Sequence, residues 1–286
     1  MPIDTPEGPQ LQLAVLYGSY ELLLRTCITS GRAAAMLVVQ NIHKHFGGLA
    51  AVDDTSFEVA QGTITSLIGP NGAGKTTLFN IISGLLRPSA GTVLFKGIDI
   101  TGWSPQRIAR AGMGRTFQNV QLFPNLNAVE NVIAARFCRT RSSFPEALLF
   151  LPRDRRERQR SREVAEELLD WVGIGAHRFL MPRELPYGDQ RRLEVARTLA
   201  TEPELLMLDE PSAGMSHLEA QELMDLIGRL RERGTTILLI EHNMNLVMSI
   251  SDKIVVLNFG KKIAEGSAAA IQTDPEVIEA YLGAEA

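Results

Sequence analysis

The sequence contains little cysteine, and this scarcity excludes a fold stapled together by disulfide bonds. The 286 residues include two cysteines, Cys27 and Cys138, whose separation does not match the spacing of metal ligands. Two such thiols cannot form the disulfide framework of a small secreted domain. The simplest interpretation is a protein that works in a reducing compartment.

A surplus of positive charge is also missing. The 29 basic residues are outnumbered by 33 acidic ones, which gives a formal net charge of −4. Proteins that coat nucleic acid usually carry a basic surplus, so composition predicts no nucleic-acid partner, although a local basic patch would be compatible with it. Apolar residues make up 45% and charged residues 22% of the chain, which argues for a globular core and against wholesale disorder.

Long apolar runs are lacking, and no run of 18 or more apolar residues is present to span a bilayer. The best candidate, Leu11 to Ile28, is interrupted by polar and charged residues. It is also a poor signal peptide, because Asp4 and Glu7 precede it where a basic region belongs. We therefore interpret residues 1–35 as an appendage, either a functional helix or a stretch present only through the choice of start codon.

From Met36 onward, apolar segments of two periodicities alternate along the chain. Short continuous runs predict strands buried on both faces, and helical spacing predicts helices between them. This alternation indicates a largely parallel α/β sheet. The predicted strands are Leu37–Val39, Thr63–Ile68, Thr92–Phe95, Leu205–Leu208, Thr236–Ile240 and Ile254–Leu257, and the predicted helices are Leu78–Leu85, Val164–Trp171, Glu219–Arg231 and Met244–Ile250.

A polar, arginine-rich stretch lies between Ala134 and Arg162. Six arginines fall between Arg153 and Arg162, interleaved with Asp154 and Glu157. A solvated helix face is the first interpretation of such a run, and a docking surface is the second.

Residues 69–76 match the pattern of a loop that binds phosphate. They fit G-x-x-x-x-G-K-[ST], with a predicted strand before them and a predicted helix after them. The glycines let backbone N–H groups wrap round the anion, and the helix start adds its positive dipole end. Lys75 would reach the β- and γ-phosphates, and the Thr76 hydroxyl would bind Mg²⁺. The predicted nucleotide-binding residues of the loop are Gly69, Pro70, Asn71, Gly72, Ala73, Gly74, Lys75, Thr76 and Thr77.

Two acidic residues, Asp209 and Glu210, end the predicted strand Leu205–Leu208. A carboxylate at a strand end opposite a phosphate loop can hold the water shell of Mg²⁺, and this role falls to Asp209. Glu210 would point elsewhere and polarise a water in line with the γ-phosphate. A phosphate loop alone does not separate a kinase, a GTPase and a transport ATPase, so further motifs must decide.

Four further motifs follow one specific order along the chain. Phe46 precedes the phosphate loop, Gln118 follows it in Arg-Thr-Phe-Gln, residues 185–189 read Leu-Pro-Tyr-Gly-Asp, and His242 follows a predicted strand. With these motifs, the chain from Met36 to about Leu282 resembles the ATP-binding subunit of ABC transporters. A kinase or a GTPase with a phosphate loop would lack the signature segment 185–189 and His242.

The resemblance implies a role for each of these residues. Phe46 would stack on adenine, and Gln118 would touch Mg²⁺ and the attacking water and sense the membrane subunits. His242 would be the switch histidine that contacts the γ-phosphate, and Glu210 would be the catalytic carboxylate. Gly188 would cap the ATP bound by the other subunit of a head-to-tail dimer, with residues 212–216 as a loop at the same interface.

The resemblance also implies a fold. A P-loop ATPase core with a mixed sheet, an N-terminal antiparallel β subdomain and an inserted helical signature subdomain are expected within residues 36–286. Gln118 and Gly188 lie 70 residues apart, which leaves room for the helical subdomain at about residues 116–186. ATP and Mg²⁺ are the expected cofactors, with Thr76, Gln118 and Asp209 as metal-binding residues.

Two departures from the family pattern matter. The signature usually has Ser-Gly where this chain has Pro186-Tyr187, and proline offers neither a hydroxyl nor an N–H to a γ-phosphate. The usual glutamine is Asp189, which we expect to turn toward solvent or toward Arg192, because it would repel bound triphosphate. Ser216 stands where the interface loop usually carries an acid, which puts that cross-dimer contact in doubt.

A finer resemblance connects the chain to the ATPases of branched-chain amino acid importers, and it is carried by residues 46–52, 114–124, 187–194 and 240–244. It implies peripheral attachment at the cytoplasmic face of the inner membrane. The implied partners are a second ATPase, identical or different, two transmembrane permeases and, indirectly, a periplasmic binding protein. Uptake of urea or short amides, lipopolysaccharide export and a soluble non-transport ABC ATPase remain alternatives.

Overall fold

The computed structural model describes residues 35–118, 120–139 and 152–282. The chain divides into two units, residues 1–34 and 35–286, and the account below concerns the second. The prediction for Leu11–Ile28 lies outside the described residues, as does all but the last residue of the predicted appendage. None of the helices in the described ranges is long and apolar enough to cross a membrane.

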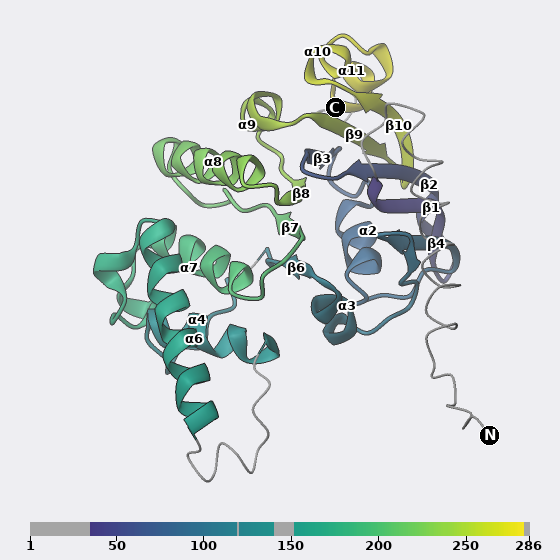
Figure 1. The fold of residues 1–286 in the computed structure, drawn as a ribbon. Coiled ribbons are helices and arrows are strands. Elements are labelled where there is room, and N and C mark those ends of the chain that lie inside the picture. Colours follow the sequence, from purple (N-terminus) through teal and green to yellow (C-terminus); the bar gives the residue numbers. More distant parts are fainter. Residues whose placement is uncertain (1–34, 119, 140–151, 283–286) are drawn as a thin grey trace, which may run out of the picture. The chain divides into compact units, whose positions relative to one another are not determined.

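A six-stranded mixed sheet forms the centre of this unit (Figure 1). Its strand order is β10-β9-β3-β8-β7-β6, with β10 antiparallel to β9 and the other pairs parallel. The order differs from the chain order, so segments distant in sequence become neighbours. The strands are β3 (Ile64–Ile68), β6 (Met113–Arg115), β7 (Leu205–Asp209), β8 (Thr236–Ile240), β9 (Lys253–Asn258) and β10 (Lys261–Gly266).

An antiparallel sheet of four strands comes from the first part of this unit, in the order β2-β1-β4-β5. Its strands are β1 (Ala35–Phe46), β2 (Leu49–Ala60), β4 (Ala90–Phe95) and β5 (Ile98–Asp99). Together the two sheets confirm the expected mixed α/β core with an antiparallel β portion.

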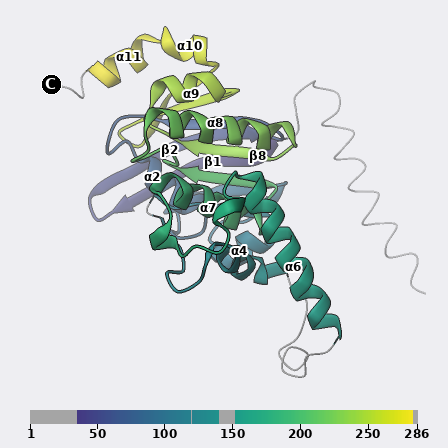
Figure 2. The ribbon, with the colours of Figure 1, turned by 90° about the vertical axis from the view of Figure 1, so that its left-hand side faces the viewer.

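Helices cover the central sheet and extend beyond it (Figures 1 and 2). Helices α4, α6 and α7 pack against one another, as expected for a helical portion that carries the signature segment. The limits of a separate subdomain at about 116–186 stay a prediction. The α-helices are α2 (Lys75–Ile82), α3 (Pro105–Ala111), α4 (Ala128–Arg136), α6 (Pro152–Trp171), α7 (Tyr187–Leu199), α8 (His217–Glu232), α9 (Met244–Ile250), α10 (Ala268–Gln272) and α11 (Pro275–Leu282), and the 3-10 turns are η1 (Phe137–Arg139), η2 (Gly175–His177) and η3 (Pro182–Glu184).

Strand β7 shows why its sequence is a continuous apolar run. Leu205 and Met207 enter a core shared with the antiparallel sheet and α2, whereas Leu206 and Leu208 enter a core shared with α7 and α8. Successive side chains of a strand point to opposite faces, so both faces need apolar residues here. The carboxyl end of β7 is thereby held rigidly, and the two acidic residues follow directly.

Helix α6 is longer than its predicted core, Val164–Trp171, because it begins at Pro152. Its first half is polar, so apolar periodicity gives no signal for a helix there. Arg155, Arg156 and Arg160 are exposed, which supports the solvated-face interpretation of the arginine-rich stretch. Helix α2 ends earlier than predicted, because Gly84 adopts a left-handed conformation.

Asn131 on α4 is fully buried and fixes the turn that leads from the Gln118 region into this helix. Its side chain accepts a hydrogen bond from the Phe123 N–H (2.9 Å) and donates to the carbonyls of Phe123, Leu126 and Asn127.

Replacing Asn131 by leucine, whose side chain branches at the same atom, should lower the free energy of unfolding by about 2–4 kcal/mol, because several buried backbone groups lose their partners. Urea unfolding measures this loss. Gln221→Leu, which removes an exposed i,i+4 contact on α8, is the control. Equal stability of the Asn131 variant and this control would show that the turn does not depend on the amide.

Candidate active site

The phosphate loop joins β3 to α2, as the sequence predicted. Gly69 and Gly74 adopt positive φ angles of 148° and 97°. A Cβ atom on Gly69 would lie 2.1 Å from the Leu257 carbonyl oxygen, and one on Gly74 would lie 2.5 Å from that of Ala51. Both glycines are therefore required by close backbone approach as well as by conformation. The loop is a tight backbone cradle that ends at the N-terminus of a helix, an arrangement suited to phosphate.

Lys75 places its charge inside this loop. Its Nζ atom donates hydrogen bonds to the carbonyl oxygens of Gly69 (2.7 Å) and Pro70 (2.9 Å). Burial lowers the pKa of Lys75, while the nearby carboxylates of Glu210 and Asp209 oppose that shift. The ammonium is thus poorly solvated, and an anionic phosphate group would be a better partner than the two carbonyls.

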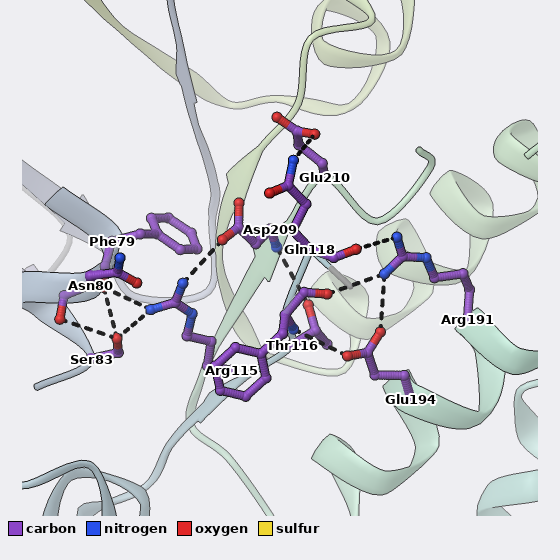
Figure 3. A network of polar contacts seen from close by, with 11 residues as sticks. Phe79, Asn80, Ser83, Arg115, Thr116, Gln118, Arg191, Glu194, Asp209 and Glu210 are labelled. Carbon is purple, nitrogen blue, oxygen red and sulfur yellow. Dashed lines mark hydrogen bonds and ion pairs between the residues drawn. The ribbon is translucent and has the colours of Figure 1, made fainter. Parts of the chain in front are cut away.

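Asp209 lies buried at the end of β7, where it pairs with a residue that the sequence analysis did not assign (Figure 3). Arg115 on β6 donates from Nη2 to Oδ2 of Asp209 (3.0 Å) and from Nη1 to the Ser83 hydroxyl (2.5 Å). Burial raises the pKa of Asp209, and the guanidinium of Arg115 opposes this rise. Arg115 therefore holds one carboxylate oxygen in a fixed direction.

Glu210, which follows Asp209 directly, has a left-handed backbone with φ of 47°. Such a conformation costs a residue with a side chain about 1–3 kcal/mol, so the rest of the structure must hold it. The Glu210 N–H donates to the Ile240 carbonyl (2.9 Å). Its carboxylate accepts a hydrogen bond from Nε2 of Gln118 (2.9 Å), and Nδ1 of His242 lies 3.9 Å away. The three predicted catalytic residues therefore meet in one place.

Glu241 is a second residue that the sequence analysis missed. It is fully buried between the ends of β7 and β8, and it accepts hydrogen bonds from the N–H groups of Ser212 (2.9 Å) and His242 (3.1 Å). The carboxylate thereby ties the loop after Glu210 to the loop that carries His242. An acidic residue directly after the apolar run Thr236–Ile240 was the available signal.

Phe46 lies at the end of β1 with 47% of its surface exposed. The Lys44 ammonium is 5.1 Å from the centre of its ring. An exposed aromatic face at a strand end can stack on a base, which is the predicted role. Thr76 is exposed and Thr77 half-buried in the first turn of α2.

The signature segment opens helix α7, with Pro186 as the residue before it and Gly188 buried in its first turn. The prediction for Asp189 was wrong in its partner. Oδ2 of Asp189 accepts a hydrogen bond from Nδ1 of His177 (2.7 Å), while Arg192 contacts Glu222 and the Val172 carbonyl. The turn η2 brings His177 next to the start of α7, and this approach depends on tertiary packing.

Ser216 is the N-cap of α8 and forms a capping box with Glu219. Glu219 also lies against Gly188, since a Cβ atom there would be 2.6 Å from its Oε1. The serine thus has a structural role at the position where the family usually has an acid. Any side chain at Gly188 would therefore disturb Glu219 of its own chain. A loss of activity in a variant such as Gly188→Asp would reflect this disturbance as well as any clash with nucleotide.

The donor set suits a metal ion that is held partly by phosphates. Among the described residues, no group of three or more His, Cys, Asp or Glu side chains is placed to hold a metal. The predicted metal-binding residues Thr76, Gln118 and Asp209 offer oxygen atoms, and Mg²⁺ prefers a few such oxygens together with substrate phosphates. These residues fit a phosphate-bound Mg²⁺ better than a structural transition metal.

Comparison with known proteins decides the family. A family model described as ABC transporter matches residues 52–213, a span that includes the phosphate loop, Gln118, the signature segment and both acidic residues. The chain belongs to the ABC transporter family. A second model, described as branched-chain amino acid ATP-binding cassette transporter, matches residues 261–286.

Relatives and a solved structure agree with this assignment. The chain is 45% identical to the high-affinity branched-chain amino acid transport ATP-binding protein LivG of Salmonella typhimurium, over 87% of this chain and 98% of LivG. It is 36% identical to the lipopolysaccharide export system ATP-binding protein LptB of Acidithiobacillus ferridurans, over 87% and 97% of the two chains. The ADP conformation of MJ1267, an ATP-binding cassette of an ABC transporter, superposes with a TM-score of 0.77 at 31% identity, covering 88% of this chain and all of that one.

The chain is therefore an ATP-binding, ATP-hydrolysing cassette of the ABC type, and the recognition made from its motifs is confirmed. Cassettes of this family work as dimers with membrane permease subunits. The individual roles of the site residues stay predictions.

Proposed function

We propose that this cassette energises the import of branched-chain amino acids. The observation that supports the proposal is the extent of the likeness to LivG, which covers 98% of that protein. The match of residues 261–286 to the branched-chain amino acid model adds a second, local reason. That segment includes β10 and α11, outside the part of the chain matched by the general transporter model.

The site geometry suggests how the chain hydrolyses ATP. The phosphate loop and Lys75 hold the triphosphate, and Glu210 accepts a proton from the attacking water as its oxygen approaches the γ-phosphorus. Gln118 holds the Glu210 carboxylate in place through the 2.9 Å hydrogen bond to Oε2, and Nδ1 of His242 lies 3.9 Å from the same oxygen. Bound Mg²⁺, held by Thr76, Gln118 and Asp209, would neutralise charge on the phosphates.

The proposal includes a head-to-tail dimer in which Gly188 caps the ATP of the other subunit. The second ATPase is either the same chain or a related one. Two transmembrane permeases and, through them, a periplasmic binding protein complete the importer, with the cassette at the cytoplasmic face of the inner membrane. A pocket lined by Met113, Phe117 and Arg197 lies next to Gln118, the residue implied to sense the membrane subunits. We propose this pocket as the permease contact.

Lipopolysaccharide export is the second candidate function, since LptB is a relative over nearly the same length. The lower identity, 36% against 45%, favours amino acid import. Measurements of leucine uptake separate the two candidates, because loss of an ATPase that serves lipopolysaccharide export would leave leucine uptake unchanged.

Deletion of the gene should abolish high-affinity uptake of labelled leucine, and the wild-type chain should restore it. A Glu210→Gln chain should restore less than about 1% of the rate, because general base catalysis contributes roughly 10²- to 10⁴-fold. Urea and acetamide uptake, measured in the same cells, should not change. Normal leucine uptake in the deletion strain, or loss of urea uptake in its place, would overturn the substrate assignment.

A further inference from the structure

Arg191 on helix α7 is almost completely buried and directs two of its four side-chain hydrogen bonds to residues 116–118, the loop that carries Gln118, which we call the Gln118 loop. Its side chain is 3% exposed. Nη1 donates to the Phe117 carbonyl (3.1 Å), and Nη2 donates to the Gln118 carbonyl (2.5 Å). A guanidinium has five donors in a rigid fork, so binding to two successive carbonyls fixes both the position and the direction of that backbone.

Glu194, one helix turn after Arg191, completes the contact. It accepts a hydrogen bond from the Phe117 N–H (3.1 Å) and one from Nη1 of Arg191 (3.2 Å). The pair therefore holds the N–H and the carbonyl of Phe117 together with the carbonyl of Gln118. We call Arg191 and Glu194 the α7 clamp. Figure 3 shows the clamp on one side of Gln118 and Glu210 on the other.

The other end of the loop is attached to the central sheet. The Thr116 N–H donates to the Met207 carbonyl on β7 (2.9 Å), and the Thr116 hydroxyl accepts a hydrogen bond from the Asp209 N–H (3.4 Å). Thr116 is thus hydrogen-bonded to β7, whereas the next residue, Phe117, is hydrogen-bonded to α7. Because the Gln118 side chain bonds to Glu210, any movement of α7 relative to β7 must move Gln118 relative to that carboxylate.

Tyr187 gives this arrangement a link to the signature segment itself. Nε of Arg191 donates to the Tyr187 hydroxyl (3.1 Å), and the guanidinium lies 5.4 Å from the centre of the tyrosine ring. The ring also packs against Gly214 in the loop after Glu210, where a Cβ atom would come within 3.1 Å of it. The tyrosine that replaces the usual signature glycine therefore orients Arg191.

We propose that Arg191 is a positioning residue for ATP hydrolysis, and that the α7 clamp makes the Gln118 loop follow the signature end of α7. The inference rests on the proposed function, in which Gly188 at that end of α7 caps the second ATP of a dimer. Docking of α7 on one ATP would then hold Gln118 in its hydrogen bond to Glu210 at the other ATP, which this chain binds through its own phosphate loop. The clamp thereby couples the two sites of the dimer.

The test removes both members of the clamp at once. A single Arg191→Met change would leave the Glu194 charge buried without its partner, and breaking a buried pair destabilises a protein far more than replacing both members by apolar residues. The test variant is therefore Arg191→Met with Glu194→Leu. The control is Arg192→Met with Glu222→Gln, because this neighbouring pair joins α7 to α8 and does not touch the Gln118 loop.

The first measurement is amide hydrogen exchange at Phe117 in the full-length chain without nucleotide. We expect exchange roughly 10- to 100-fold faster in the test variant, since the hydrogen bond to a charged acceptor is lost, and wild-type exchange in the control. Unchanged exchange at Phe117 in the test variant would show that the clamp does not hold the loop, and would overturn the inference.

The second measurement is steady-state hydrolysis by the cassette assembled with its partner subunits. We expect kcat to fall roughly 10- to 100-fold while KM for ATP stays near the wild-type value, because the residues that bind nucleotide are intact. A wild-type kcat in a variant whose Phe117 amide is released would reduce the clamp to a structural contact. Equal losses in the control would do the same.

Arg191→Lys keeps the charge but not the fork, and serves as a variant that folds if the double variant does not. We expect faster Phe117 exchange and a lower kcat than wild type, because one ammonium cannot hold two carbonyls and Glu194 in the same geometry. Full rescue by lysine would overturn the inference. Normal leucine uptake in the deletion strain would instead refute the proposed function, and the exchange result at Phe117 is independent of that outcome.

Discussion

A Glu210→Gln chain should bind ATP as tightly as the wild type and hydrolyse it about 100- to 10,000-fold more slowly. An amide cannot accept the proton of the attacking water, whereas the carboxylate can. The substitution keeps the size of the side chain and the left-handed backbone at φ of 47°, so the fold should not change. Because the γ-phosphate stays in place, the dimer should persist with ATP trapped in it.

Phosphate release by the assembled cassette measures this loss, and size-exclusion chromatography with ATP detects the trapped dimer. Glu241→Gln is an informative comparison, because that buried carboxylate holds the N–H groups of Ser212 and His242. It should lower the melting temperature as well as the rate, while Glu210→Gln lowers the rate alone. Wild-type turnover by Glu210→Gln would move the general base to another residue.

A Lys75→Ala chain should lose hydrolysis by about 100- to 1,000-fold and also bind ATP more weakly, since a preorganised charge that meets the phosphates in a poorly solvated site is removed. Burial lowers the pKa of Lys75, which means that the folded state disfavours the charged form. Below that pKa, the charge therefore opposes folding in the absence of ATP, and its removal should not reduce the melting temperature of the free chain.

Thermal unfolding with and without ATP checks both parts of this expectation. At a given ATP concentration, tighter binding raises the melting temperature further, so the upward shift expected with the wild type should shrink or vanish in Lys75→Ala. Lys253→Ala, which removes a cation paired with Glu265 away from the loop, is the control and should keep the ATP-dependent shift. An undiminished shift in Lys75→Ala would contradict the role of the ammonium in the loop.

The pattern of apolar residues along the chain predicted several strands and helices correctly. The run Thr236–Ile240 matches β8 residue for residue, and Met244–Ile250 matches α9. All five residues of β8 are buried, and α9 buries Leu246 and Val247, so in both segments the apolar pattern of the sequence records burial. The sequence did not predict the first half of α6, because this segment is polar and has no apolar period, and Arg155, Arg156 and Arg160 are exposed.

The sequence by itself determined the phosphate loop and the acidic end of β7, because each is a contiguous motif whose chemistry depends on neighbours along the chain. The tertiary structure alone decided which side chains hold those motifs in place. Arg115 reaches Asp209 across 94 residues, and Arg191 reaches the Phe117 carbonyl across 74. Their partners follow from the strand order of the sheet and from the packing of α7 on the core. Spacing along the chain carries no signal for such contacts, since they arise only when distant elements become neighbours in space.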